Sequence, residues 1–204
     1  MLGKVGIAAG TLALCFLLLI AAAAAGVVSL LTGGLLGGGG NGRVAQTGDD
    51  YGPVVCTVGG GVHDGGLDLA AQQVANAAVI NQVALEDGIA PASRAIVIAL
   101  AAAFQESGLE NLDYGDRDSL GLFQQRSSQG WGNPSQIMNP AYAAQQFYRH
   151  LQRVPDWWAV PLWQAAQAVQ RSGLPTAYQK WEPEAEIIQQ FLAANPNICE
   201  LSKK

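Results

Sequence analysis

The run of ten consecutive apolar residues from Ala95 to Phe104 is the feature that most constrains how this chain can fold. A helix over this run, with Ser93 as its N-cap, would be apolar on every face, so it has to be buried on all sides. Half of the residues are hydrophobic, which is enough to build a core around such a helix. We therefore expect a compact domain around a buried central helix that ends near Glu106.

Other segments also carry helical signals. Strong helix formers follow Asp68, a candidate N-cap, up to Gly88, and Asn139 and Pro140 stand where a cap and a first turn belong. The predicted helices cover about 69–86, 140–154, 162–173 and 184–194. Strand signals are confined to short stretches within 109–125 and near "VVCTV". The predicted fold class is mainly α.

The N-terminus carries a long apolar segment. Val5 to Leu31 is 27 residues without a charge, and as a helix it would exceed the roughly 30 Å hydrocarbon core of a bilayer. We predict a transmembrane anchor over 1–32, with the N-terminus in the cytoplasm. The alternative is a cleaved secretory signal, with Lys4 as its positive region and "AAAAAG" as its cleavage site.

Glycine dominates residues 33–51, which is typical of a flexible linker. Both interpretations of the N-terminus place the domain at 52–204 outside the cytoplasm, where disulfides persist. Cys56 and Cys199 stand near the two ends of that domain, and domain ends often lie close together in space. A Cys56–Cys199 disulfide is one prediction, and two unrelated buried thiols are the alternative.

The charge distribution argues against nucleic acid as a ligand. Lys4 and Arg43 balance Asp49 and Asp50, so the whole formal net charge of -5 falls on residues 51–204. Proteins that bind nucleic acid usually have the opposite sign. The two histidines, His63 and His150, are isolated and lack the companions of a zinc site, so we expect no metal and no cofactor.

An acidic loop, "FQESGLENLDYGDRDSLGLFQQR", follows the apolar helix at 104–126. Glu106 is the first charged residue after that helix, so the core would hold its backbone rigidly. The negative end of the helix dipole and apolar neighbours both raise the pKa of a carboxyl group placed there. A carboxylic acid that stays partly protonated near neutral pH is what general-acid cleavage of a glycosidic bond requires.

Two motifs in this loop resemble a known family. "QESGL" is followed, fifteen positions after Glu106, by "GLFQ", and the pair resembles the soluble-type lytic transglycosylases of the lysozyme-like superfamily. "GDRDSLGLFQQRSSQGWG" is also similar to extracellular wall hydrolases of high-GC Gram-positive bacteria. The resemblance covers about 75–180 and implies a lysozyme-like α+β fold and peptidoglycan as substrate. It also implies Glu106 as the catalytic acid and Ser107 as the serine that orients it.

The same resemblance assigns the second motif to substrate binding. Gly121, Leu122 and Gln124 match it, and Phe123 replaces a methionine. Where the family has a tyrosine on a later helix that contacts the catalytic acid, this chain has "AVQRSG" at 168–173. The phenol could come instead from Tyr142, Tyr148 or Tyr178, or Gln170 could hydrogen-bond in its place.

Further candidates come from the loop and its surroundings. Trp131 could stack on a sugar face, and Gln124 and Gln125 suit hydrogen bonds to N-acetyl or hydroxyl groups. A second carboxylate that activates water could be one of three residues in the loop: Asp113, Asp116 and Asp118. The alternative is a solvated turn in which these aspartates cap backbone amides and Arg117 pairs with one of them.

We therefore expect a membrane-tethered enzyme, acting outside the cytoplasm, that cleaves the β-1,4 bond between N-acetylmuramic acid and N-acetylglucosamine. If the 6-hydroxyl of the sugar is the nucleophile, the product is a 1,6-anhydro end; if water is, the enzyme is a lysozyme-type hydrolase. A rival from another class is a non-catalytic peptidoglycan-binding module of an envelope-spanning secretion or conjugation apparatus. The missing family tyrosine favours that rival, and the retention of Glu106 argues against it.

Overall fold

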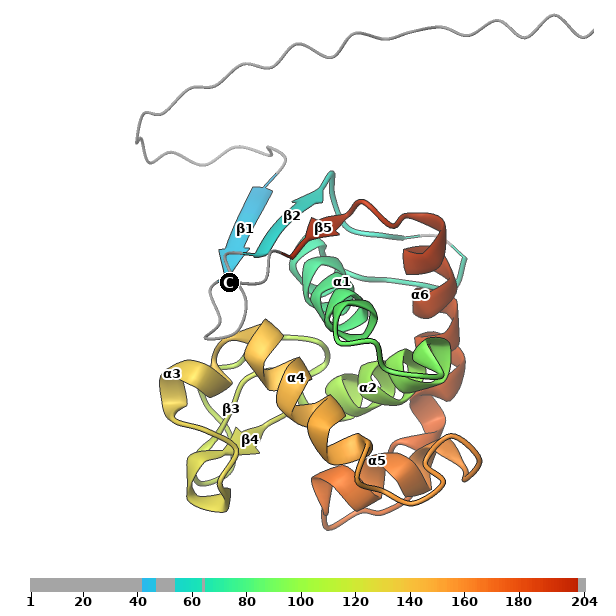
Figure 1. The fold of residues 1–204 in the computed structure, drawn as a ribbon. Coiled ribbons are helices and arrows are strands. Elements are labelled where there is room, and N and C mark those ends of the chain that lie inside the picture. Colours follow the sequence, from blue (N-terminus) through green and yellow to red (C-terminus); the bar gives the residue numbers. More distant parts are fainter. Residues whose placement is uncertain (1–41, 47–53, 64, 202–204) are drawn as a thin grey trace, which may run out of the picture. The chain divides into compact units, whose positions relative to one another are not determined.

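The computed structural model describes residues 42–46, 54–63 and 65–201 (Figure 1). The predicted membrane anchor, residues 1–32, lies outside this range. Within the described residues, no helix has both the length and the apolar character needed to cross a bilayer.

The described part of the chain is mainly helical, as predicted. Figure 1 shows its helices packed around α2. The six α-helices found there are α1 (Ala71–Glu86), α2 (Ala92–Ser107), α3 (Pro134–Ile137), α4 (Pro140–Leu151), α5 (Leu162–Gln170) and α6 (Glu182–Ala194).

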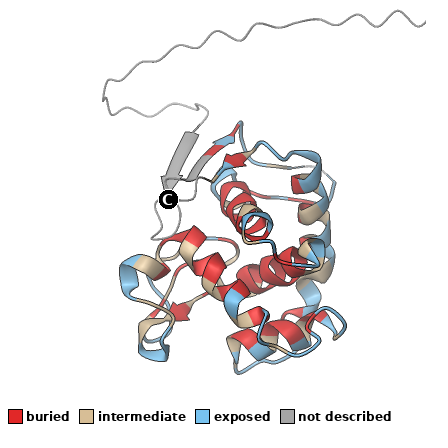
Figure 2. Cartoon of the chain, viewed as in Figure 1, coloured by how far each residue is buried: buried red, intermediate tan, exposed pale blue. Residues whose placement is uncertain are grey.

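Helix α2 is the buried centre of the domain, which confirms the first expectation from the sequence. All ten residues from Ala95 to Phe104 are buried, and α2 packs against α1, α4, α5 and α6 (Figure 2). The helix ends at Gly108, whose φ of 66° is left-handed. The Gly108 and Leu109 amides donate to the carbonyls of Phe104 and Ala103, a termination that glycine favours. Glu106 therefore lies in the last turn of a fixed helix.

Two helix starts differ from the prediction. Helix α1 begins at Ala71, and the Gln73 side chain, not Asp68, accepts a hydrogen bond from the free Ala70 amide at 2.8 Å. Asp68 instead lies 2.7 Å from the His63 ring nitrogen. Helix α2 begins after Pro91 without a side-chain cap, so Ser93 is not its N-cap. Asn139 does cap α4, as predicted, because its side chain accepts from the Ala141 and Tyr142 amides.

A three-stranded antiparallel sheet joins the two ends of the domain. Its order is β1 (Gly42–Gln46), β2 (Val54–Val58) and β5 (Cys199–Glu200). Cys56 and Cys199 are direct partners in the β2–β5 register, and a disulfide joins them across 143 positions of sequence. The predicted disulfide is confirmed, and two free thiols are excluded.

Strand β1 corrects the predicted extent of the flexible linker. Residues 42–46 fall inside the segment 33–51 assigned to the linker, yet they pair along their whole length with β2. The folded unit therefore begins before residue 52. Strand pairing depends on a partner elsewhere in the chain, so a glycine-rich local sequence is a poor guide to it.

The loop after α2 forms a short hairpin, β3 (Ser119–Leu120) with β4 (Gln125–Arg126). Gly121 lies in its turn with a φ of 74°, and a Cβ there would lie 2.6 Å from the Ile137 carbonyl oxygen. Only glycine fits at this position, because it needs both a left-handed backbone and close approach to α3. A 3-10 turn, η1 (Ser127–Gln129), leads from the hairpin toward α3.

Candidate active site

A cavity of about 760 Å³ opens beside the end of α2 and includes Glu106 in its wall. One side comes from the β3–β4 hairpin and the residues around it, from Asp116 to Trp131. The other side comes from the end of α4 and from α5 with its exit, Ala168 to Gly173. We call this cavity the Glu106 cleft.

The hydroxyl of Tyr178 donates a hydrogen bond to the Glu106 carboxylate at 2.7 Å. Tyr178 is fully buried, and burial followed by the nearby Glu106 charge raises the pKa of its phenol well above the usual range. The phenol therefore stays protonated and serves as a fixed donor. Of the tyrosines that could replace the family's, Tyr178 contacts the acid, whereas the Tyr148 hydroxyl donates to the Ile80 carbonyl. The Gln170 side chain, the other alternative, also hydrogen-bonds to Glu106.

The segment that carries Tyr178 is docked directly on the last turns of α2. Tyr178 precedes the 3-10 turn η2 (Gln179–Trp181). The Trp181 ring stacks on Phe104 with centroids 5.0 Å apart, and its indole nitrogen donates to Gln105 at 3.0 Å. These contacts fix the phenol relative to Glu106, although 72 positions separate the two residues in sequence.

Burial raises the pKa of Glu106 above its ordinary value of 4.5. Hydrogen bonds from Tyr178 and Gln170 stabilise the ionised form and oppose this shift, but they are the smaller effects. Gln170 also donates to the Phe123 carbonyl at 2.8 Å, so it connects α5 with the second motif. The predicted direction of the Glu106 shift is confirmed, and desolvation is its main cause.

Ser107 connects the two motifs and does not contact Glu106 through any hydrogen bond found among the described residues. Its hydroxyl lies 2.7 Å from the Leu122 carbonyl and 3.1 Å from the Ala103 carbonyl. Its effect on Glu106 is therefore indirect: it ties the end of α2 to the "GLFQ" segment.

The second motif is divided between the cleft and the core. Gln124 lines the cleft and donates to the Tyr114 carbonyl at 3.2 Å. Gln125 lines it too but is only 2% exposed, and its amide donates to the Ala143 carbonyl. Phe123 is buried and stacks on Phe147 with centroids 4.8 Å apart. Phe123 and Gly121 thus shape the scaffold, and the prediction that they bind substrate is not supported.

Trp131 lines the cleft, as expected of a residue that stacks on a ligand. Its ring lies 4.2 Å from the His150 ring, centroid to centroid. The His150 Nδ1 is 2.8 Å from the Gln146 carbonyl oxygen, so this nitrogen carries a proton. One face of the indole is held by the imidazole, so the two sides of the cleft meet at this ring contact.

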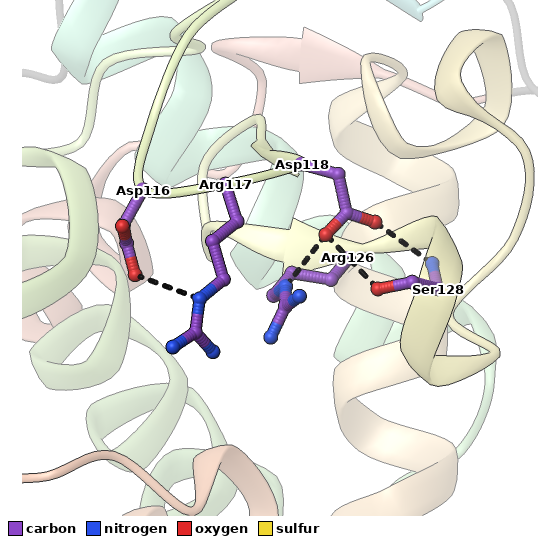
Figure 3. Close-up of polar contacts among 5 residues, drawn as sticks. All are labelled: Asp116, Arg117, Asp118, Arg126 and Ser128. Carbon is purple, nitrogen blue, oxygen red and sulfur yellow. Dashed lines mark hydrogen bonds and ion pairs between the residues drawn. The ribbon is translucent and has the colours of Figure 1, made fainter.

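The three aspartates of the loop have different surroundings. Asp113 is exposed and lies outside the cleft lining, whereas Asp116 lines it. Asp118 accepts hydrogen bonds from the Ser128 amide, the Ser128 hydroxyl and the Arg126 Nε, all within 2.9 Å (Figure 3). The Ser128 amide, followed by Arg126, holds the pKa of Asp118 far below its usual range. Asp118 is thus a structural anion, and Asp116 remains as a second carboxylate in the cleft.

Sequence reasoning missed the arginines of the cleft. The lining includes Arg117, Arg126, Arg153 and Arg171, contributed by the loop, β4 and the ends of α4 and α5. Only Arg117 was considered from the sequence, as a partner of an aspartate. It lies 3.8 Å from Asp116, an ion pair in which both side chains are exposed.

No group of three or more His, Cys, Asp or Glu residues in the described part of the chain could hold a metal ion. A carboxyl group with a raised pKa, held by a buried phenol, can protonate a leaving group and take a proton back.

No protein-family model matches this chain, and no match was found among curated proteins.

Proposed function

We propose that this protein cleaves the β-1,4 bond between N-acetylmuramic acid and N-acetylglucosamine in peptidoglycan, on a lysozyme-like α+β scaffold, with Glu106 as the general acid and base. One observation carries the proposal: Glu106 lies in the wall of a large cleft, its pKa raised by burial, and a buried tyrosine donates to it at 2.7 Å. Such an environment favours the protonated form of the acid and holds it toward the ligand.

In the proposed reaction, the Glu106 carboxyl group gives its proton to the bridging oxygen as the bond from C1 of the muramic residue breaks. Glu106 is then a carboxylate, which the Tyr178 hydroxyl stabilises through its hydrogen bond. The carboxylate takes the proton of the muramic 6-hydroxyl as that oxygen bonds to C1. The products are a 1,6-anhydro end and a free 4-hydroxyl, and Glu106 regains its proton.

The surroundings of the aspartates favour this intramolecular route over hydrolysis. An inverting hydrolase needs a second carboxylate free to activate water. Asp118 is occupied by Arg126 and Ser128, and Asp113 lies outside the lining. Asp116 alone remains as a candidate base in the cleft, so a lysozyme-type outcome depends on Asp116.

The rival class, a non-catalytic wall-binding module, was favoured by the absence of the family tyrosine. Tyr178 supplies a phenol to Glu106 from a different part of the chain, which removes that argument. We therefore propose an active enzyme.

The test uses the full-length protein in detergent, incubated with purified peptidoglycan, and mass spectrometry of the soluble products. We expect fragments with 1,6-anhydro ends from the wild type and from Asp116→Asn, and none from Glu106→Gln. Reducing ends that disappear in Asp116→Asn would establish a hydrolase instead. A folded wild type that releases no fragments would overturn the proposal.

A further inference from the structure

The Glu106 cleft has a local charge opposite to that of the protein. The chain has 11 Lys and Arg residues against 16 Asp and Glu residues. Yet the cleft lining contains four arginines and two acidic side chains, Glu106 and Asp116. The lining of the Glu106 cleft is therefore positively charged, although the protein as a whole is negatively charged.

The four arginines of the cleft differ in whether they form ion pairs with acidic residues. The Arg126 Nε lies 2.7 Å from the Asp118 carboxylate, which holds it in place. In Figure 3 the side chains of Arg117 and Arg126 extend in the same direction from the loop and the strand. Arg153 and Arg171 are exposed, and no ion pair joins either of them to an acidic residue of the described ranges. Two guanidinium groups are therefore without an ion pair in this described part of the chain, and the exposed Arg117 pairs with the likewise exposed Asp116 at 3.8 Å, so that solvent and ligand still reach it.

Backbone geometry indicates that two of these arginines are kept at some expense of stability. Arg117 and Arg171 have φ values of 57° and 54°, and Gln124, also in the lining, has 47°. Side chains other than glycine and asparagine rarely adopt this left-handed region, and such residues cluster at ligand sites. Glycine would suit both arginine positions better for folding alone.

We propose that Arg117, Arg153 and Arg171 bind carboxylate groups carried by the glycan strand, so that the cleft selects anionic over neutral β-1,4 glycans. This inference rests on the proposed function, because the muramic residue is the sugar that bears such a group. Its lactyl carboxylate is either free or extended into a peptide stem with carboxylates of its own. The planar guanidinium fork matches a carboxylate through two parallel hydrogen bonds, which a lysine does not reproduce.

The experiment measures binding separately from cleavage. Full-length Glu106→Gln protein in detergent is titrated with three labelled probes: stem-free peptidoglycan strands, stem-bearing strands and neutral chitooligosaccharides of matched length. Fluorescence anisotropy gives the affinities. We expect both anionic probes to bind more tightly than the neutral one, and this advantage to shrink as salt is raised.

Removing the arginines should remove the preference. Arg153→Gln and Arg171→Gln, added to Glu106→Gln, should each weaken binding of the anionic probes by about two- to fivefold, the range for exposed ion pairs. Binding of the neutral probe should not change. Arg149→Gln is the matched control, since Arg149 lies in the last turn of α4, four residues before Arg153, but lines a different cavity.

Two further variants separate binding from folding. Arg171→Gly should keep or raise the melting temperature, because it relieves the left-handed backbone, and still weaken anionic binding. Arg153→Lys should restore only part of the affinity. An effect on both anionic probes assigns the lactyl carboxylate, and an effect on stem-bearing strands alone assigns the stem. Equal affinity for neutral and anionic probes would overturn the inference, whereas a wild type that discriminates but does not cut would overturn only the proposed function.

Discussion

Glu106 and Asp118 are two carboxylates of the same short stretch of sequence with opposite surroundings. Glu106 lies in the last turn of a buried helix, where desolvation raises its pKa. Asp118 lies just before β3, and the Ser128 amide and Arg126 lower its pKa. Burial thus favours the protonated form of the first group, whereas the hydrogen-bond donors around the second favour its ionised form. The local sequence is acidic throughout, so burial and partners, rather than composition, assign these roles.

The largest effect is expected from Glu106→Gln. Glutamine keeps the size and hydrogen-bonding reach of the side chain but cannot transfer a proton. General acid and base catalysis typically contributes about 10² to 10⁴ in rate, so release of soluble fragments from peptidoglycan should fall at least by the lower figure. The measurement is the initial rate of fragment release at equal concentrations of folded protein.

Glu110→Gln is the control for Glu106→Gln. Glu110 is exposed, belongs to the same acidic stretch and lies outside the cleft lining. Its substitution should leave the rate nearly unchanged. If both variants lose activity to the same degree, the contrast between Glu106 and other carboxylates of the loop does not hold.

Tyr178→Phe should have the next largest effect. A hydrogen bond to a charged group is worth about 1.5 to 3 kcal/mol, so the rate should fall by about ten- to a hundredfold. That hydrogen bond lowers the pKa of Glu106, and its loss therefore raises the pKa further. Because the reaction needs protonated Glu106, the decline of activity at high pH should move to higher pH, which a pH–rate profile measures.

Tyr148→Phe is the matched control, since Tyr148 is equally buried and its hydroxyl also donates to a partner in the core. Tyr148→Phe should lose about 0.5 to 1.5 kcal/mol of unfolding free energy and Tyr178→Phe, whose partner is a carboxylate, about 1.5 to 3 kcal/mol. Only Tyr178→Phe should shift the pH–rate profile. An unshifted profile in both would mean that the phenol does not influence the acid.

The scaffold around Glu106 was largely predictable from the sequence, because the signal is local. Ten apolar residues without a polar face require a buried helix, and the first charged residue after it must then lie where core and surface meet. The helix signals for α1, α4, α5 and α6 were equally local, with errors of a few residues at their ends. The exception is Asp68, which was predicted to cap α1 but contacts His63 instead. The Gln73 side chain accepts the hydrogen bond from the Ala70 amide at the start of α1.

The partners of Glu106 were not predictable in the same way. Tyr178 reaches it because η2 docks on the end of α2 through Trp181, and no periodic pattern announces such a contact. The arginines of the cleft were not predicted, because Arg153 and Arg171 follow different helices and come together only in the folded chain. The negative net charge of the protein also gave no indication of a positively charged site. Strand β1 was missed for the same reason, since its pairing partner decides its structure.

Asp118→Asn should affect folding more than chemistry. Asparagine keeps one acceptor oxygen but turns an amide NH₂ toward the Arg126 and Ser128 donors. The loss of activity should be smaller than the hundredfold expected of Glu106→Gln, and the melting temperature should fall. A lowered pKa stabilises the fold above the ordinary value of 3.8 and loses that contribution as pH falls.

The difference in melting temperature between the wild type and Asp118→Asn should therefore be largest near neutral pH and shrink below about pH 3.8. Thermal unfolding across this range measures it. Asp113→Asn is the control, because Asp113 is exposed and forms no ion pair among the described residues. A difference that does not change with pH would show that shape, and not charge, explains the effect.

The smallest effect concerns the stability of Glu106→Gln, and its sign should be opposite to that of Asp118→Asn. A raised pKa means that the wild type is stabilised by protonation below the ordinary value of 4.5 and loses this contribution as pH rises. Glutamine carries no charge at any pH and does not oppose the negative end of α2, an effect of about 0.3 to 1 kcal/mol. Glu106→Gln should thus unfold at a higher temperature than the wild type near neutral pH and at the same temperature below about pH 4.5. If instead it is less stable near neutral pH, the hydrogen bond between Tyr178 and the ionised carboxylate outweighs desolvation, and Glu106 would resemble Asp118 more than it differs from it.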